Sequence, residues 1–278
     1  MEKKTSRRSS AFSRSFRILL AVAVLAVIFA MPAFAASSKK GVKTNQWVTK
    51  NGYYYYRGND GNCVTGVQVI KKKCYLFDTK GRQLHGWRKL GNRYFFFKNK
   101  NGAKGNLAVS TTINGIVINE KGVAQLTSSE AKLKAETMAN YSLWTDSFIR
   151  PTMTNKEKLY ACRDVLTGYG YLSEGDSIIK KSNWDVICAS EMYDRRNKGP
   201  AKKRANCYRF AAAFAYMANS IGYTDIKCCG YVGHGWMMIG NNVFDVIMSI
   251  KFGLKYFPVP NYRNNRYNAT SVRDLRQL

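Results

Sequence analysis

Three residues in the C-terminal half of the chain have the types and the order that thiol chemistry requires. Cys207 lies in the first turn of a predicted helix, where the helix dipole favours a thiolate, and Lys203 and Arg204 add positive charge nearby. His234 is one of two histidines among 278 residues, and Asp245 is one of few acids in an apolar, strand-like run. A thiolate, a histidine base and a carboxylate that orients the base are the groups of a nucleophilic attack on a carbonyl.

The local pattern predicts that His234 and Asp245 meet. Gly240-Asn241 is a two-residue hairpin signal, and the chain after it is expected to return as a partner strand over residues 242–247. Pairing through that turn places His234 and Asp245 on one face as diagonal neighbours. A three-residue loop would instead place them on opposite faces.

The elements around these residues predict an α+β domain over residues 127–278, with helices first and an antiparallel sheet after them. Two helices are expected after the capping signals Thr127-x-x-Glu130 and Thr154-x-x-Glu157. Residues 171–203 read as irregular and basic, with packing points at Trp184, Ile187 and Met192. The clearest helix starts near Cys207 and stops at Gly222, and its apolar face is formed by Phe210, Phe214, Met217, Ala218 and Ile221.

Three motifs in order resemble the transglutaminase-like superfamily, the circularly permuted relatives of papain-type cysteine peptidases. They are Asn206-Cys207-Tyr208-Arg209-Phe210-Ala211, Gly233-His234-Gly235-Trp236 and Val243-Phe244-Asp245, within about residues 130–250. The resemblance implies a transglutaminase-like, papain-like fold and catalytic roles for Cys207, His234 and Asp245. It also implies an oxyanion hole from the Cys207 backbone N–H and an upstream donor, for which Trp184 is one candidate.

Each residue alone also has a structural explanation. A lone cysteine is more often a buried structural thiol, and a lone strand histidine is often simply hydrogen-bonded. The three together, in the order of the motifs, favour an active thiolate site. We expect neither a cofactor nor a metal, because Cys228-Cys229 lacks C-x-x-C spacing and His85 is expected to be a bystander in a turn. If Cys207 is free, six other cysteines can pair or stay reduced: Cys63, Cys74, Cys162, Cys188, Cys228 and Cys229.

Residues 41–126 repeat with a period near twenty. Large apolar residues recur at Trp47, Val67, Trp87 and Leu107, and glycines recur at Gly61, Gly81, Gly102 and Gly122. Aromatic runs bounded by glycine turns indicate β-hairpins, and one hairpin of this size cannot bury its own face. Stacked hairpins in a short β-solenoid are therefore expected.

The segment resembles the cell-wall-binding repeats of Gram-positive surface proteins, of the choline- and glucan-binding type, over roughly four units. The last unit, residues 113–126, is degenerate. The resemblance implies binding of cell-wall polysaccharide, teichoic acid or peptidoglycan through aromatic rings. The candidate wall-binding residues are Trp47, Tyr54, Tyr75, Trp87 and Tyr94. Any single ring is also a candidate for the solenoid core.

The charge of the chain indicates an anionic partner. There are 45 Lys and Arg against 17 Asp and Glu, a net charge of +28. Residues 1–35 have the basic start, apolar run and Ala-x-Ala end of a cleaved signal peptide. Residues 37–126 then carry 17 bases against three acids. Outside the membrane the anionic partners are wall polymers, so nucleic acid is not expected, and neither is a stable membrane span after cleavage.

The sequence thus predicts a secreted, cell-wall-associated thiol enzyme that acts on amide bonds of a peptide or protein substrate. It does not choose between hydrolysis, as in a peptidase or amidase, and acyl transfer to an amine, as in a transglutaminase. An alternative is a non-catalytic surface-binding or adhesive protein with an inactive transglutaminase-like core. A third is an enzyme that acts on host or medium proteins and uses the repeats as a tether.

Overall fold

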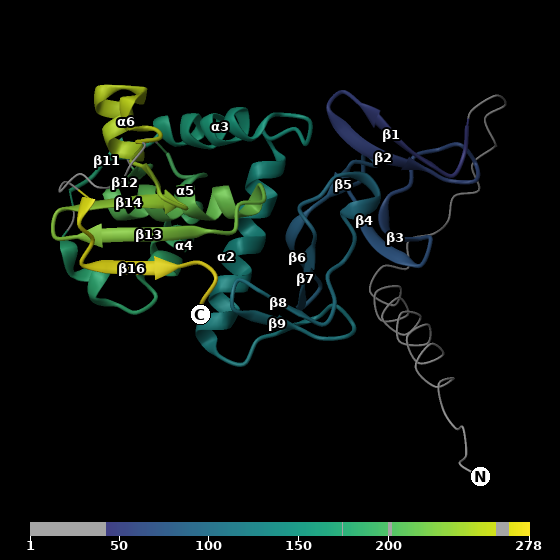
Figure 1. Cartoon of the computed structure of the whole chain (residues 1–278), viewed down its shortest axis with the longest axis horizontal. Helices are drawn as coiled ribbons and strands as arrows, with labels where there is room; N and C mark the ends of the chain where they lie inside the picture. The colour runs from purple at the N-terminus through teal and green to yellow at the C-terminus, as the bar shows by residue number, and fades with distance from the viewer. Residues whose placement is uncertain (1–42, 174, 200–201, 260–266) are drawn as a thin grey trace, which may run out of the picture. The chain divides into compact units, whose positions relative to one another are not determined.

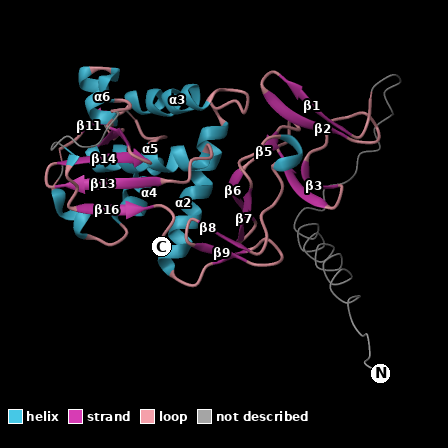
Figure 2. Ribbon diagram, viewed as in Figure 1, coloured by secondary structure: helices cyan, strands magenta, loops and turns pink. Residues whose placement is uncertain are grey.

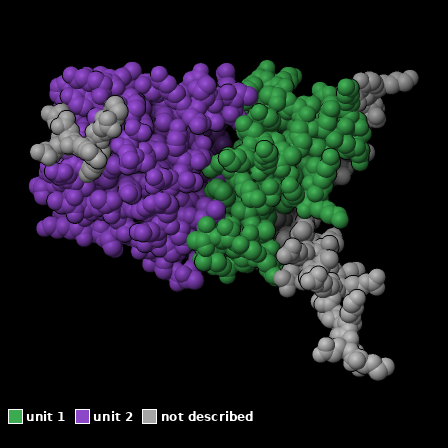
Figure 3. Space-filling view, viewed as in Figure 1, with its two compact units in different colours: residues 1–85, 89–112, 117–125 green, residues 86–88, 113–116, 126–278 purple. Residues whose placement is uncertain are grey.

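The computed structural model of the chain describes residues 43–173, 175–199, 202–259 and 267–278. The predicted signal peptide, residues 1–35, lies outside the described residues. The chain divides into two compact units, coloured separately in Figure 3. Unit 1 holds the residues up to His85, Lys89–Thr112 and Val117–Gln125, and unit 2 holds Gly86–Arg88, Ile113–Ile116 and Leu126–Leu278.

Short sheets form the repeats (Figure 1), as the hairpin signals predicted. They are β1-β2, β3-β4-β5, β6-β7 and β8-β9-β10, with a turn of 3₁₀ helix, η1, between the last two. The bounds are β1 Gln46–Lys50, β2 Tyr53–Arg57, β3 Gly66–Ile70, β4 Lys73–Phe77, β5 Gln83–Leu84, β6 Gly86–Leu90, β7 Arg93–Phe97, η1 Gly102–Lys104, β8 Thr111–Ile113, β9 Ile116–Ile118 and β10 Ala124–Gln125.

The periodic glycines have a common backbone reason. Gly61, Gly81, Gly102 and Gly122 have φ of 77°, 77°, 57° and 79°, in the left-handed region that a side chain disfavours. At Gly122 a Cβ atom would also lie 2.6 Å from Leu107 Cδ2, inside the core of the repeats. The period near twenty therefore reflects one left-handed glycine turn for each hairpin.

The apolar residues of the same period form two core clusters in unit 1. The first contains Tyr56, Ile70, Tyr75 and Phe77, with Trp47 and Val64 packed against it. The second contains Leu76, Leu90, Phe95, Phe97 and Leu107, with Val67, Cys74, Leu84 and Val123 packed against it. Each cluster draws on more than one hairpin, because a single two-stranded ribbon has too little surface to bury itself.

Unit 2 is a mixed helix and sheet structure, which confirms the α+β prediction (Figure 2). Its main sheet is antiparallel, with the order β15-β14-β13-β16. The bounds are α2 Ser129–Asp146, α3 Asn155–Thr167, β11 Gly170–Tyr171, η2 Asp176–Lys180, α4 Trp184–Arg195, β12 Arg204–Ala205, α5 Cys207–Ser220, β13 Ile226–Tyr231, β14 His234–Ile239, β15 Asn242–Phe244, α6 Val246–Phe252, η3 Leu254–Tyr256 and β16 Ser271–Asp274.

Helix α5 is the centre of unit 2. Every residue from Cys207 to Asn219 is buried, and the helix contacts α2, α4, β13 and β14. Polar residues of so enclosed a helix need partners within the protein, and Arg209 has one in Glu191. The Ala-rich middle of α5 lets neighbouring elements approach closely. The helix start at Cys207 is thus held from several directions.

Two predictions about elements of unit 2 need correction. Residues 171–203 are not irregular throughout, because α4 occupies 184–195 and buries Trp184 and Met192. Its N-cap, Asn183, makes no side-chain capping bond, so the segment lacks the usual start signal and depends on packing. The partner strand does not run to residue 247 but stops at Phe244, and α6 follows.

Of the two predicted helix caps, one is found in the structure and the other is replaced by its neighbour. Thr154 and Glu157 form the predicted capping box at the start of α3. Helix α2, however, is capped by Ser128, whose hydroxyl accepts from the Ala131 N–H, and not by Thr127. Since neighbouring Thr and Ser are both good caps, the sequence alone does not separate them.

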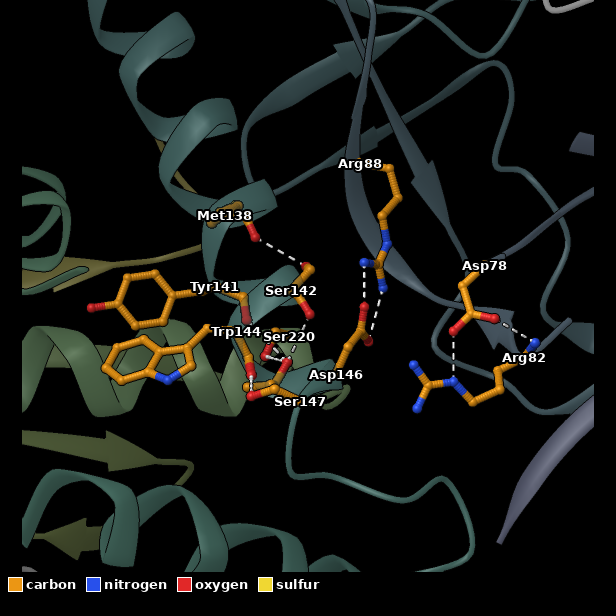
Figure 4. Close-up of polar contacts among 11 residues, drawn as sticks. Asp78, Arg82, Arg88, Met138, Tyr141, Ser142, Trp144, Asp146, Ser147 and Ser220 are labelled. Atoms are coloured by element: carbon orange, nitrogen blue, oxygen red, sulfur yellow. Dashed lines mark hydrogen bonds and ion pairs between the residues drawn. The ribbon is translucent and has the colours of Figure 1, made fainter. Parts of the chain in front are cut away.

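The short repeat segments assigned to unit 2 are joined to it by polar contacts. The Arg88 guanidinium meets both carboxylate oxygens of Asp146, at the end of α2, at 2.5 and 3.1 Å (Figure 4). The Trp87 indole N–H donates to Asn114 Oδ1 at 3.1 Å, and the Asn114 amide donates to the Leu275 carbonyl. These bonds hold both segments in unit 2.

Among the described residues, no helix has the length and apolar character that a membrane crossing requires.

Candidate functional site

Cys207 occupies the first position of α5. Asn206 precedes it as the N-cap, and its side-chain oxygen accepts a hydrogen bond from the Arg209 N–H at 3.2 Å. The Arg209 side chain turns to Glu191, which accepts from its Nε at 2.6 Å. The thiol therefore lies at the positive end of a buried helix. With 3% of its surface exposed, Cys207 is itself nearly enclosed.

The structure brings His234 and Asp245 together. His234 Nε2 and Asp245 Oδ2 are 2.6 Å apart, and the Asp245 carboxylate is wholly buried. The predicted register is confirmed, because Ile239 pairs with Asn242 across a two-residue turn. Asp245 lies just past the end of β15 and, as the N-cap of α6, accepts from the Met248 N–H through Oδ1 at 3.0 Å. One carboxylate thus orients a histidine and starts a helix.

The thiol and the imidazole are held close by the turn between β13 and β14. Cys207 Sγ lies 4.0 Å from the Gly233 carbonyl oxygen, next to His234 in the chain. The Tyr208 hydroxyl donates to the Tyr231 carbonyl at 2.7 Å and accepts from the Gly233 N–H at 3.2 Å. This residue of α5 therefore fixes both sides of the turn. A Cβ atom on Gly235 would lie 2.6 Å from Tyr208 Cδ1, so the close approach of α5 to β14 requires glycine.

The surroundings of His234 favour its protonated form. Burial lowers the pKa of His234, but the hydrogen bonds and charges of Asp245 and Cys207 outweigh burial and raise that pKa to about 9. Because Nε2 is engaged with Asp245, Nδ1 is the nitrogen left to serve the Cys207 thiol.

Two aromatic residues that sequence reasoning missed cover this pair. The Trp236 ring stacks on the His234 ring, with centroids 5.9 Å apart and an interplanar angle of 29°. The Tyr267 hydroxyl donates to Asp245 Oδ2 at 3.3 Å, and its ring meets Trp236 edge-on. Trp236 had a signal, since it lies two residues after His234 and so on the same face of a strand. Tyr267 is distant in sequence and had none.

Trp184 does not have a free indole N–H. Its Nε1 donates to the Ser271 hydroxyl at 3.0 Å, although its ring does reach Tyr208, with the ring centroids 6.0 Å apart. As an oxyanion donor it would have to break that bond. The backbone N–H of Cys207, at the open end of α5, is the donor that the geometry leaves available.

The other cysteines contrast with Cys207. All seven are free thiols. Burial raises the pKa of Cys74, Cys188 and Cys229 to about 12 each, which keeps these thiols protonated and unreactive. Cys63 is exposed and provides an internal reference for an ordinary accessible thiol.

The five predicted wall-binding rings separate into two groups. Tyr75, Trp87 and Tyr94 are 1–2% exposed and therefore belong to the interior, which was the alternative explanation for any single ring. Trp47 and Tyr54 are only partly buried. A Cβ atom on Gly102 would lie 3.9 Å from both the Trp47 and the Tyr54 rings, so these two rings converge over the same glycine.

Trp47 is the centre of an aromatic cluster that spans two hairpins. Its ring centroid lies 5.3 Å from that of Tyr56, 5.1 Å from that of Tyr75 and 5.9 Å from that of Phe77. The Tyr75 hydroxyl is turned away and donates to the Ala103 carbonyl at 2.9 Å. Tyr56, Tyr75 and Phe77 are buried, so Trp47 is the ring of this cluster that is partly exposed and can offer a face to a cation with an apolar surface, such as a quaternary ammonium group.

Comparison with known proteins identifies a repeat family in residues 64–106, a segment that does not include Trp47 or Tyr54. Residues 64–106 match the choline-binding repeat family, which confirms the prediction of cell-wall-binding repeats in that segment. No curated protein matches the chain. The family match lies within the repeats, and the transglutaminase-like character of unit 2 stays a prediction.

Several solved structures are similar to part of the chain. One is the choline binding domain of Spr1274 in Streptococcus pneumoniae, with 26% identity over 31% of this chain and 98% of that one, and a TM-score of 0.27. Another is choline binding protein F from Streptococcus pneumoniae, with 25% identity over 32% of this chain and 34% of that one, and a TM-score of 0.20. A third is a pneumococcal cell wall endolysin from phage Cp-1 complexed with choline, with 24% identity, 31% and 26% coverage, and a TM-score of 0.22.

Proposed function

We propose that the chain is a secreted thiol enzyme of the Gram-positive cell wall, with repeats that bind choline-bearing wall polymers and a C-terminal unit that acts on amide bonds. The observation that carries the catalytic half is the contact of 2.6 Å between His234 and a wholly buried Asp245, beside a cysteine at a helix start. A structural cysteine needs none of these partners. We assign residues 127–278 to the catalytic domain.

In the proposed reaction the Cys207 thiolate attacks an amide carbonyl carbon. The negative charge that develops on the carbonyl oxygen is stabilised by the N–H groups at the start of α5. The C–N bond then breaks, and the imidazolium of His234 gives its proton to the departing amine. The thioester that remains is cleaved by water, which yields an acid, or by an amine, which yields a new amide. Either route returns the proton to His234 and frees the thiolate.

The wall-binding half rests on the family match and on the exposure of Trp47 and Tyr54. A choline group placed against these rings is bound by cation–π attraction and by burial of its methyl groups. Wall peptides would then be the nearest amide substrates. We expect Trp47→Ala to lose choline binding, whereas a substitution of the buried Tyr94 acts through folding. Choline binding that survives in the Trp47→Ala variant would argue against this site.

The catalytic proposal is tested by the rate of thiol alkylation. With iodoacetamide near pH 6, Cys207 should react faster than the exposed Cys63 in the same molecule, although Cys207 is nearly enclosed. The advantage should disappear in His234→Ala. Labelling of Cys207 no faster than of Cys63 would instead favour the alternative, a wall-binding protein with an inactive core.

The reaction itself requires a product assay. Purified peptidoglycan incubated with the full chain should release an amine or ammonia by either route, with new free carboxyl groups if water is the acceptor and with new amide bonds in their place if an amine is. The Cys207→Ala variant is the matched control, since it retains the repeats and so the same access to the wall. No product difference between the two proteins would refute the enzyme.

A further inference from the structure

The first hairpin has two chemically different faces. In the β1-β2 register, Trp47 pairs with Tyr56 and Thr49 with Tyr54, which places the aromatic cluster on one face. The alternate pairs, Val48 with Tyr55, Lys50 with Tyr53 and Gln46 with Arg57, lie on the opposite face. The hairpin therefore carries the candidate choline-binding rings on one face and the cations Lys50 and Arg57 on the opposite face.

This second face lines a hollow of about 600 Å³. Its walls come from β1 and β2, from the loop after β2 and from the turn after β4. Besides apolar stems, the lining offers hydrogen-bond donors of neutral type, Asn51 and Asn62, and three cations, Lys50, Arg57 and Lys80. A concave surface with convergent polar groups is the usual form of a ligand site.

The lining of the hollow carries more positive than negative charge among the described residues. Lys50, Arg57 and Lys80 have no ion pair with any part of the chain that the structure describes. Two acids lie near them in the sequence, and one of them, Asp60, is bonded to the lining residue Asn62. Asp78 pairs with Arg82 at 2.5 Å, and Asp60 accepts both the backbone and the side-chain N–H of Asn62 at 2.9 Å.

We propose that this hollow binds the phosphodiester groups of a wall polymer, with Lys50, Arg57 and Lys80 as the cations that hold the anion. Phosphate suits the site because the planar guanidinium of Arg57 can make two parallel hydrogen bonds to it, and the two lysines add point charges. The hollow goes beyond the proposed function, which places choline on the other face of the hairpin. Together the two faces would recognise both charges of a polymer that carries phosphate and choline.

The test compares two triple variants of the full chain on choline-free poly(glycerol phosphate). Lys50→Gln/Arg57→Gln/Lys80→Gln removes the cations of the hollow. Lys73→Gln/Lys98→Gln/Lys100→Gln removes the same charge from exposed positions of the repeats outside the hollow. We expect the first to weaken binding at least about thirtyfold and the second less than about threefold, because a charge-assisted bond is worth more than a distant charge. Circular dichroism checks that both variants fold.

Equal weakening by the two variants would overturn the site, since only net charge would then matter. Binding of the polymer that is unchanged in the first variant would overturn it too. Choline binding, measured separately, should be retained in both variants. If the wild-type chain binds poly(glycerol phosphate) through the hollow but does not bind choline, the phosphate site stands and the choline part of the proposed function fails.

Discussion

Replacing Asp245 with Asn tests the reasoning about the active site most directly. Asn has nearly the same shape and, through its side-chain oxygen, can still accept from the Met248 N–H as the cap of α6. The substitution therefore removes the charge beside His234 while the helix start is kept. Asp245 is the first of the groups that raise the pKa of His234 against the effect of burial. Without that charge, the effect of burial, which lowers the pKa of His234, should dominate.

The size of the effect follows from the pKa of about 9 for His234, against an ordinary value of 6.5. In Asp245→Asn we expect the pKa of His234 to fall to 6.5 or below, and a fall from about 9 to 6.5 corresponds to roughly 3 kcal/mol. A raised histidine pKa stabilises the folded state fully below pH 6.5 and loses that contribution as the pH rises to about 9. The variant should therefore be less stable than the wild type at pH 6, and the difference should narrow towards pH 9.

The assay is an NMR titration of the histidine ring protons, which is simple because the chain has two histidines. A His85→Gln variant assigns the signals. Tyr267→Phe is the matched control, since it removes a neutral hydrogen bond to the same Asp245 oxygen and keeps the charge. A pKa of His234 in Asp245→Asn within about half a unit of the wild-type value would refute the assignment of Asp245 as the group that holds the proton on His234.

Three further substitutions have defined outcomes. Tyr208→Phe removes both bonds to the β13–β14 turn and should slow Cys207 alkylation at least about fivefold, with a changed pH profile, at a stability cost of about 1 kcal/mol. Gly235→Ala should cost about 1–3 kcal/mol in denaturant unfolding, because its Cβ would meet Tyr208 at 2.6 Å, whereas Gly175→Ala, which meets nothing within 4 Å, should cost little. Lys134→Met should cost about 1–3 kcal/mol, since the buried ammonium donates to the carbonyls of Leu275 and Gln277 and both would lose their donor; an unchanged unfolding midpoint would contradict that role.

Features that depend on neighbours in sequence could be predicted without the structure. The glycine period marks left-handed turns, and the two-residue turn at Gly240-Asn241 sets a register that places His234 and Asp245 on one face. The start of α5 near Cys207 follows from the apolar period of the residues after it, in one stretch of chain. Each of these is a local rule of backbone geometry, so the sequence contains all the information that the rule uses.

Features that depend on packing were decided only by the tertiary structure. Whether a ring binds a ligand or fills the core is a matter of burial, and Trp47 remains partly exposed while Tyr94 does not. The bond from Tyr208 to Tyr231 and the bond from Tyr267 to Asp245 each join residues that are distant in sequence. Helix α4 has no side-chain capping bond, so its start depends on packing. The amino-acid sequence by itself determined the order Cys207, His234, Asp245, and the folded chain decided their distances, because close packing of remote side chains has no period from which it can be read.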